Sequence, residues 1–424
     1  MLKLKNTVGA LMLAAAATLG SGAVAQDFPG FADWDEVVEK ARGQSVFWFM
    51  WGGSDAINGF VDDFYGKPLL AEFGITLKRV PVADTADVVN QVISEKEAGA
   101  TGDRGSVDLI WINGENFFTL RQADLLYGPW AEGMPNAAIV DWDNPAVNLD
   151  FGRPVDGYES TWSSAQFHFV YDSARMDEAD LPRSYADLTS WIEANPGQFS
   201  YIAPGPGAFV GTRFVKQLFF EMSGGHAQWV GEFNEDLYNK WAPEVWKTLI
   251  AWKPNLWREG DTYPTSNAEL RDLFSNGEVE FDFTQSPSGA APNIASGLVP
   301  PTSRAFAFDA NLIGDFNYVA IPFNAPNKAA ALVTANLILR PDLQAAQVQP
   351  DNGFCCGWGI AVDRVTDVNY LAAIQQAMKN LGNASADPAR LSGALVADIA
   401  AEYQTRIEAD WQAFVLRGEP MPAN

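Results

Sequence analysis

Two continuous apolar runs constrain the fold of this chain more than any other feature. Residues 45–51 read Ser-Val-Phe-Trp-Phe-Met-Trp, and residues 107–112 read Val-Asp-Leu-Ile-Trp-Ile. Runs of this length and composition are typical of strands buried on both faces of a parallel sheet. A further strand and helix are predicted between them, at 76–82 and 85–98. This alternation predicts an α/β sheet with right-handed crossovers.

A second α/β unit follows in the middle of the chain. Its strands are predicted at 165–171, 199–202 and 279–283, and two further strands are predicted at 304–308 and 317–321. Its helices are predicted at 184–194, 212–222, 243–252 and 267–274. The tail from residue 328 on is predicted to be mostly helical, ending in a helix over 393–414. A chain of this length can bury two sizeable cores, so two domains are expected.

The first 25 residues have the features of a secretory signal peptide. Lys3 and Lys5 precede an apolar stretch over 8–19, and Ala23-Val-Ala25 is a cleavage signal of small residues. The alternative, a membrane anchor, is disfavoured because the stretch is short for a bilayer. We therefore predict an exported, periplasmic protein that is cut after Ala25.

The charge of the chain is strongly acidic. The formal net charge is −25, and removal of the two lysines of the leader leaves 26 basic and 53 acidic residues. Binding of nucleic acid needs a basic face, so no nucleic-acid partner is expected. The excess acid could attract cations or could simply suit a salty habitat.

The two cysteines, Cys355 and Cys356, are adjacent in the sequence. In an oxidising compartment they could close a strained vicinal disulfide or stay two buried thiols, and the sequence leaves both alternatives open. With only two histidines besides, no zinc pattern arises, and no metal site is expected.

Signatures of enzymes are mostly absent from the sequence. There is no G-x-S-x-G, H-E-x-x-H or Walker motif. The glycines at 205, 207 and 211 miss the spacing of a dinucleotide fingerprint, so no cofactor is expected. A carboxylate pair that cleaves glycans stays open as the alternative function, because acidic residues are abundant.

Positive signals for binding lie where the first and third strands end. In open α/β sheets, ligands bind beyond the carboxyl ends of the strands. The turns after the two strands supply glycine, directed polar groups and the free N–H donors of helix starts. The predicted site residues in these turns are Trp51, Gly53, Asp55, Asn113, Gly114, Glu115 and Asn116. Turn formation and helix capping would explain either turn alone, whereas the two together favour a ligand cleft.

The chain holds 15 tryptophans, and most of them are expected in the core. A tryptophan beside a cleft could stack on a ring or a cation. Trp162 is the favoured candidate because it lies just before the strand that enters the second unit.

Several blocks resemble the YnjB-type periplasmic solute-binding proteins of ABC transporters. The blocks are residues 46–55 with Trp51-Gly-Gly, residues 106–117 with the motif W-x-N-G-E-N-F, residues 318–325, 328–336 and 341–344. The resemblance covers essentially the whole mature chain. It implies a two-lobed periplasmic-binding-protein fold of type II, an α/β fold in which each lobe is a mainly parallel sheet flanked by helices and joined by hinge strands. Lobe one would comprise residues 26–167 and 313–424, and lobe two residues 168–312.

The same resemblance implies a function and further site residues. The protein would be the capture subunit of an ABC importer, a monomer that closes on a small solute and delivers it to a permease and a cytoplasmic ATPase. Thiamine or another aromatic or cationic solute is the expected ligand class, with sugars as an alternative. The residues implied near the hinges and on lobe two are Trp162, Ser164, Gln166, Thr284, Gln285, Ser286, Asp315 and Asn317.

Overall fold

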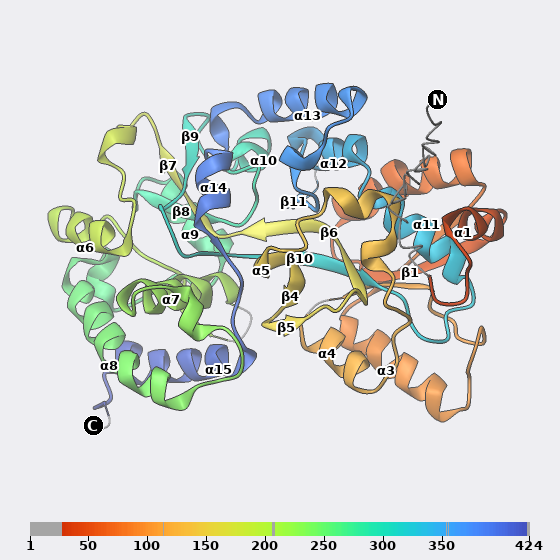
Figure 1. The fold of residues 1–424 in the computed structure, drawn as a ribbon. Coiled ribbons are helices and arrows are strands. Elements are labelled where there is room, and N and C mark those ends of the chain that lie inside the picture. The colour runs from red at the N-terminus through yellow and green to blue at the C-terminus, as the bar shows by residue number, and fades with distance from the viewer. Residues whose placement is uncertain (1–27, 113, 206–207, 353, 355, 422–424) are drawn as a thin grey trace, which may run out of the picture.

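The large sheet of the protein joins the N-terminal strands to the middle of the chain. The computed structural model describes residues 28–112, 114–205, 208–352, 354 and 356–421 (Figure 1). The sheet has the strand order β11-β6-β10-β3-β1-β2, with β12 paired to β10. Its strands are β1 (Ser45–Trp51), β2 (Thr76–Val82), β3 (Leu109–Ile112), β6 (Glu159–Gln166), β10 (Leu312–Ala320), β11 (Gly357–Trp358) and β12 (Leu395–Val396). β1 runs parallel to β2 and β3, as predicted, whereas β6 and β10 are antiparallel to each other.

A second, smaller sheet consists of β7 (His168–Asp172), β8 (Phe281–Thr284) and β9 (Ser303–Phe306). Both of its pairings are antiparallel. The two-lobed α/β fold is thus confirmed, but the mainly parallel sheet predicted for the second lobe is wrong. The residues of the predicted strand over 199–202 form no strand in the structure. A short hairpin of β4 (Leu149–Asp150) and β5 (Arg153–Pro154) lies apart from both sheets.

Buried apolar side chains form two hydrophobic cores, one packed against each sheet. The first core lies on both faces of the large sheet, and the second core surrounds the small sheet. The helices that pack with the first core are α1 (Trp34–Ala41), α2 (Asp55–Phe60), α3 (Thr85–Glu97), α4 (Glu115–Gln122), α5 (Pro145–Asn148), α11 (Lys328–Ile338), α12 (Pro341–Gln347) and α13 (Val368–Leu381). Those with the second core are α6 (Tyr185–Ala194), α7 (Phe209–Met222), α8 (Glu235–Trp252), α9 (Asn267–Ser275), α10 (Ala291–Ala295), α14 (Pro388–Ala394) and α15 (Ala401–Asp410).

The described chain passes between the two cores three times. The first passage is at Phe167, between β6 and β7, where the sequence predicted a single strand. The second runs along β10, whose Ile313 lies in the second core and whose Val319 lies in the first. The third lies between Leu381 and Ala386, after α13. Figure 1 shows β6 and β10 running between the two halves of the molecule.

The C-terminal segment lies on a different side from the one predicted. Leu391 of α14, Tyr403 of α15 and Trp411 are buried in the second core. Figure 1 likewise places α15 beside α7 and α8. The sequence assigned all of 313–424 to lobe one, but an apolar helix face packs wherever a complementary face is available, and this is set by the tertiary fold. None of the helices among the described residues has the length and apolar character needed to cross a membrane.

Candidate solute-binding cleft

The turn after β1 has a compact structure built around Trp51. The N–H group of Gly52 donates to the carbonyl of Val82 at 3.1 Å, which continues the pairing beyond the strand. The indole of Trp51 folds over Gly53, where an added Cβ would overlap the ring. Ser54 then caps α2 by accepting a hydrogen bond from the N–H group of Ile57. The Trp51 side chain stays 41% exposed, so it is free to contact a ligand.

A second indole, that of Trp111, links this turn to the hinge strands. The ring centroids of Trp51 and Trp111 are 6.4 Å apart in an edge-to-face arrangement. The Nε1 of Trp111 donates to Oδ1 of Asn317 at 3.1 Å, and Nδ2 of Asn317 donates to Oγ of Ser163 at 2.8 Å. The structure therefore joins predicted residues Trp51 and Asn317 through Trp111, a residue that the sequence analysis did not select.

Trp162 has a different position from the one predicted. Its side chain is fully buried and packs against Trp48 and Trp111 at 5.2 and 4.9 Å between centroids. In the pairing of β6 with β10, Asn317 faces Ser163 and Tyr318 faces Thr161, so Trp162 is the extra residue of a β-bulge. A bulge redirects side chains, and here it leaves the indole in the core. The prediction that Trp162 stacks on a solute is therefore wrong for this conformation.

Arg213 of α7 occupies the centre of a buried charge network at the second hinge. Its guanidinium donates to Asp315 of β10, to Gln285 and, at 3.4 Å, to Asp398. Lys216, one turn further along α7, donates to Asp398 at 2.7 Å. The network thus connects predicted residues Gln285 and Asp315 with three charged residues that the sequence analysis did not select.

The charges of this network balance. Two cations, Arg213 and Lys216, face two carboxylates, Asp315 and Asp398. Burial alone would raise the pKa of Asp398, but Lys216 and Arg213 hold that pKa below its usual value. The ring of Phe209 covers the guanidinium of Arg213 at 4.2 Å. Because its carboxylates are already matched by cations, the network presents little net charge to a ligand.

The turn before α4 is held by a buried carboxylate. Gly114 has a φ of 58°, and its N–H group donates to Oδ2 of Asp150, which is 2% exposed. The ring of Phe151 lies 3.1 Å from the place of a Cβ on Gly114. Burial raises the pKa of Asp150 well above its usual range, and the same holds for Glu159, whose two carboxyl oxygens have no hydrogen-bond partner among the described residues.

The remaining predicted residues fall into separate places. Gly114, Glu115 and Asn116 line a pocket of about 560 Å³ opposite α15, and Ser164 and Gln166 line a cavity of about 270 Å³ beside the hinge strands. Thr284 accepts a hydrogen bond from the N–H group of Ser286 at 3.1 Å, which is turn chemistry. Asp55 is exposed at the first position of α2. Asn113 and Cys355 lie outside the described residues, so their predicted roles, including the vicinal disulfide with Cys356, stay predictions.

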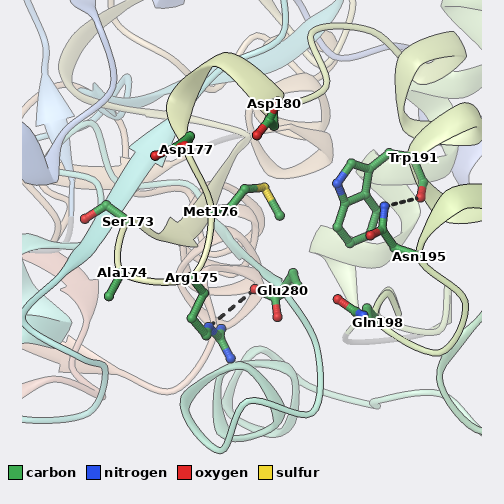
Figure 2. A pocket seen from close by; sticks show the side chains of 10 residues that line it. All are labelled: Ser173, Ala174, Arg175, Met176, Asp177, Asp180, Trp191, Asn195, Gln198 and Glu280. Carbon is green, nitrogen blue, oxygen red and sulfur yellow. Dashed lines mark hydrogen bonds and ion pairs between the residues drawn. The ribbon is translucent and has the colours of Figure 1, made fainter.

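An outer pocket of about 700 Å³ contains none of the predicted site residues. It lies on the small-sheet side, and Figure 2 shows Arg175 directed at Glu280 and Trp191 on the opposite wall. Arg175 forms ion pairs with Glu280 and Asp172 at 3.3 and 3.6 Å. Arg175, the only basic residue among those that line this pocket, is thus already paired. Elsewhere in the described chain, no three His, Cys, Asp or Glu side chains gather in a way that could hold a metal ion.

Comparison with known sequences decides the family. The family model described as bacterial extracellular solute-binding protein matches residues 64–355. The chain is 39% identical over 321 residues to protein YnjB of Escherichia coli strain K12, which covers 75% of this chain and 80% of that protein. This chain belongs to the bacterial extracellular solute-binding family. The resemblance to YnjB-type proteins is therefore confirmed, and this family consists of binding components of ABC transporters and not of enzymes.

Solved structures of other solute-binding proteins share the fold. An ABC transporter protein from Clostridium perfringens matches with a TM-score of 0.57 at 14% identity, over 88% of this chain and 98% of its own. The spermidine/putrescine-binding protein PotD of Streptococcus pneumoniae matches with a TM-score of 0.56 at 14% identity, over 89% and 100%. Trichodesmium IdiA (FutA), solved with iron and citrate, matches with a TM-score of 0.54 at 13% identity, over 86% and 96%. These likenesses support the two-lobed fold of this solute-binding protein.

Two of the residues that the sequence analysis did not select, Arg213 and Lys216, could have been found from a weak signal in the sequence of this solute-binding protein. Arg213 and Lys216 place two charges in the mostly apolar helix α7, whose residues 210–220 are all buried. Buried cations require partners, so their presence indicated a polar network. Trp111 stands two residues before Asn113, but a continuous apolar strand gives no sign of which side chain faces outward.

Proposed function

We propose that this solute-binding protein captures an aromatic, positively charged solute, such as thiamine, between its two lobes. The single observation that supports this most is the pair of indoles of Trp51 and Trp111 at the carboxyl ends of β1 and β3. A solute ring would stack on the exposed face of Trp51. Asn317, which already binds Trp111, would orient the polar edge of the solute.

The exposed charges of the turns after β1 and β3 favour a cation over an anion. Asp55 and Glu115 stand at the first helical positions after β1 and β3, and no ion pair to either occurs within the described chain. The network of Arg213 balances its own carboxylates, so these two exposed acids are the charges of the two turns that stay available to a cationic solute. A cation over an indole is worth about 0.5–2 kcal/mol, depending on how dry the site is.

The proposal includes the role in transport. Residues 1–25 would direct export and be removed, and the mature monomer would work in the periplasm. Lobe one would comprise the elements of the large sheet, and lobe two those of the small sheet together with α14 and α15. Closure of the lobes would bury the solute, and the closed form would deliver it to a permease coupled to a cytoplasmic ATPase.

A fluorescence titration tests the ligand class. The mature protein is unfolded to strip bound ligand, refolded, and titrated with thiamine while tryptophan emission is followed. We expect a saturable change at micromolar concentration, weakened about 30-fold in Trp51→Ala, which corresponds to about 2 kcal/mol. Trp257→Phe is the matched control, because this tryptophan packs, partly buried, against the second core and not against the large sheet.

Two further ligands separate charge from shape in the same titration. Spermidine carries charge without a ring, and maltose carries rings without charge. A response to maltose alone would refute a cationic ligand and leave the binding function intact. A response to thiamine that is equal in the wild type and in Trp51→Ala would refute the position of the site.

A further inference from the structure

A cavity of about 270 Å³, partly open to solvent, lies beside the hinge strands, on the face opposite Asn317. Ser164 of β6 pairs with Phe316 of β10, whereas Ser163 pairs with Asn317. Successive residues of a strand point to opposite faces, so Ser164 and Phe316 face the cavity and the Asn317 side faces the proposed solute site. The cavity is therefore distinct from the solute site.

All three passages between the two cores border this cavity. Gln166 stands at the first passage, Phe316 at the second, and Leu381 and Ala386 flank the third. The loop residue Pro287 completes the wall. A molecule in this position would contact every described connection between the halves, so its binding energy would depend on the angle between them.

The walls of the cavity are mainly apolar. Phe316, Trp358 and Leu395 belong to strands, yet each stays partly exposed because it faces this space. Such a space is wide enough for a ring compound, since a cavity of about 150 Å³ with apolar walls is known to bind benzene. The volume here is nearly twice as large and suits a bicyclic ring.

Several of the polar groups at the cavity are already engaged. Nε2 of Gln166 donates to the carbonyl of Leu391 at 2.7 Å, Oδ1 of Asn144 caps α5, and Asp141 is paired with Arg364. The hydroxyl of Ser164 forms no hydrogen bond to any described residue. The exposed side chains of Ser392 and Asp363 at the cavity likewise form no hydrogen bond or ion pair to any described residue. A ligand would therefore meet mainly apolar walls with the free hydroxyl of Ser164 on the strand side, and an anion would find no cation among the lining residues to pair with.

We propose that this hinge cavity, defined by Ser164, Phe316, Trp358, Leu381, Leu391 and Leu395, is a second binding site. Its ligand is a small, uncharged, mainly apolar bicyclic molecule with one hydrogen-bonding group that meets Ser164. Occupation of the hinge cavity restrains the three passages and thereby couples to lobe closure. The proposal is independent of the solute, because binding to the hinge cavity is measured directly.

Fluorine NMR of a fluoroindole with the mature protein tests the site. We expect saturable binding in the wild type and none in Leu391→Trp, whose larger ring fills the cavity. Met378→Trp, at the exposed rim, provides a second filling variant should Leu391→Trp fail to fold. Leu70→Trp is the matched control, because Leu70 is 58% exposed and does not line the cavity.

The proposed hydrogen bond to Ser164 and the proposed coupling to lobe closure are each tested by a separate measurement. Ser164→Ala should weaken fluoroindole about fivefold and leave fluoronaphthalene, which lacks the N–H group, unchanged. Hydrogen exchange should slow on fluoroindole binding at residues 164–167, 313–316 and 381–386. Undiminished binding in both filling variants, or protection confined to other segments, would overturn the proposal.

Discussion

Substitution of Asp398 by asparagine should destabilise the protein strongly, because it unbalances the charge network around Arg213. The side chains of Asp398 and Arg213 are 1% exposed and that of Lys216 is 0% exposed. In the wild type, two cations meet two carboxylates. After Asp398→Asn, only Asp315 remains, and Lys216 loses the ion pair that the structure gives it at 2.7 Å.

The expected size follows from the cost of a buried, unpaired charge. Removal of one partner of a buried ion pair typically costs about 3–5 kcal/mol. The structure supports this range, because water cannot reach Lys216 to replace the lost carboxylate. If the charge imbalance is the cause, Lys216→Met in the same chain should return about 2 kcal/mol, since one cation and one carboxylate then remain.

Urea unfolding at pH 7, followed by far-ultraviolet circular dichroism, gives the free energies. The matched control is the pair of Lys247 and Glu244, which has the same N–O distance of 2.7 Å but side chains 59% and 52% exposed. Glu244→Gln should cost less than about 1 kcal/mol. Equal losses for Asp398→Asn and Glu244→Gln would refute the reasoning, and so would a further loss on adding Lys216→Met.

Two further predictions concern a buried acid and a close helix contact. Burial, and secondarily the charge of Asp150, raises the pKa of Glu159 well above 4.5, so the folded protein binds a proton that the unfolded chain releases. The free energy of unfolding should therefore fall as the pH rises above 4.5. Glu159→Gln should reduce the dependence of the melting temperature on pH between about pH 5 and 8. An unchanged dependence would show that Glu159 is ionised in the folded protein. An added Cβ on Gly211 would overlap the carbonyl of Ile202, so Gly211→Ala should cost about 1–3 kcal/mol in urea unfolding. Gly59→Ala, which meets open space in a helix, should be neutral or stabilising, and a similar loss in both variants would contradict the packing argument.

The first half of the large sheet could be read from the sequence alone. β1 and β2 occupy the predicted residues 45–51 and 76–82, and α13 spans the predicted 368–381. These elements are determined by local patterns, namely continuous apolar runs, helical spacing and capping residues such as Ser54. The helix starts after β1 and β3 follow from the same signals, since α2 begins at Asp55 after the cap Ser54 and α4 begins at Glu115.

Elements whose partners are distant in sequence were predicted less well. The helix predicted over 393–414 is divided into α14 and α15, with β12 between them. Pairing of β12 with β10 requires a strand some 80 residues away, so no local pattern reports it. The strand predicted over 165–171 is likewise divided, because the chain leaves one sheet and enters the other at Phe167.

Local sequence patterns were sufficient for the α/β class, the strand-end turns and the resemblance to solute-binding proteins, since each of these depends on residues that are neighbours along the chain. Which indoles face outward, in contrast, depends on how distant strands pair. The pairing of β6 with β10 creates the bulge that buries Trp162, and the end of β3 leaves Trp111 beside Asn317. The network of Arg213 also joins residues more than 100 positions apart, and a contact of that kind exists only once the chain has folded.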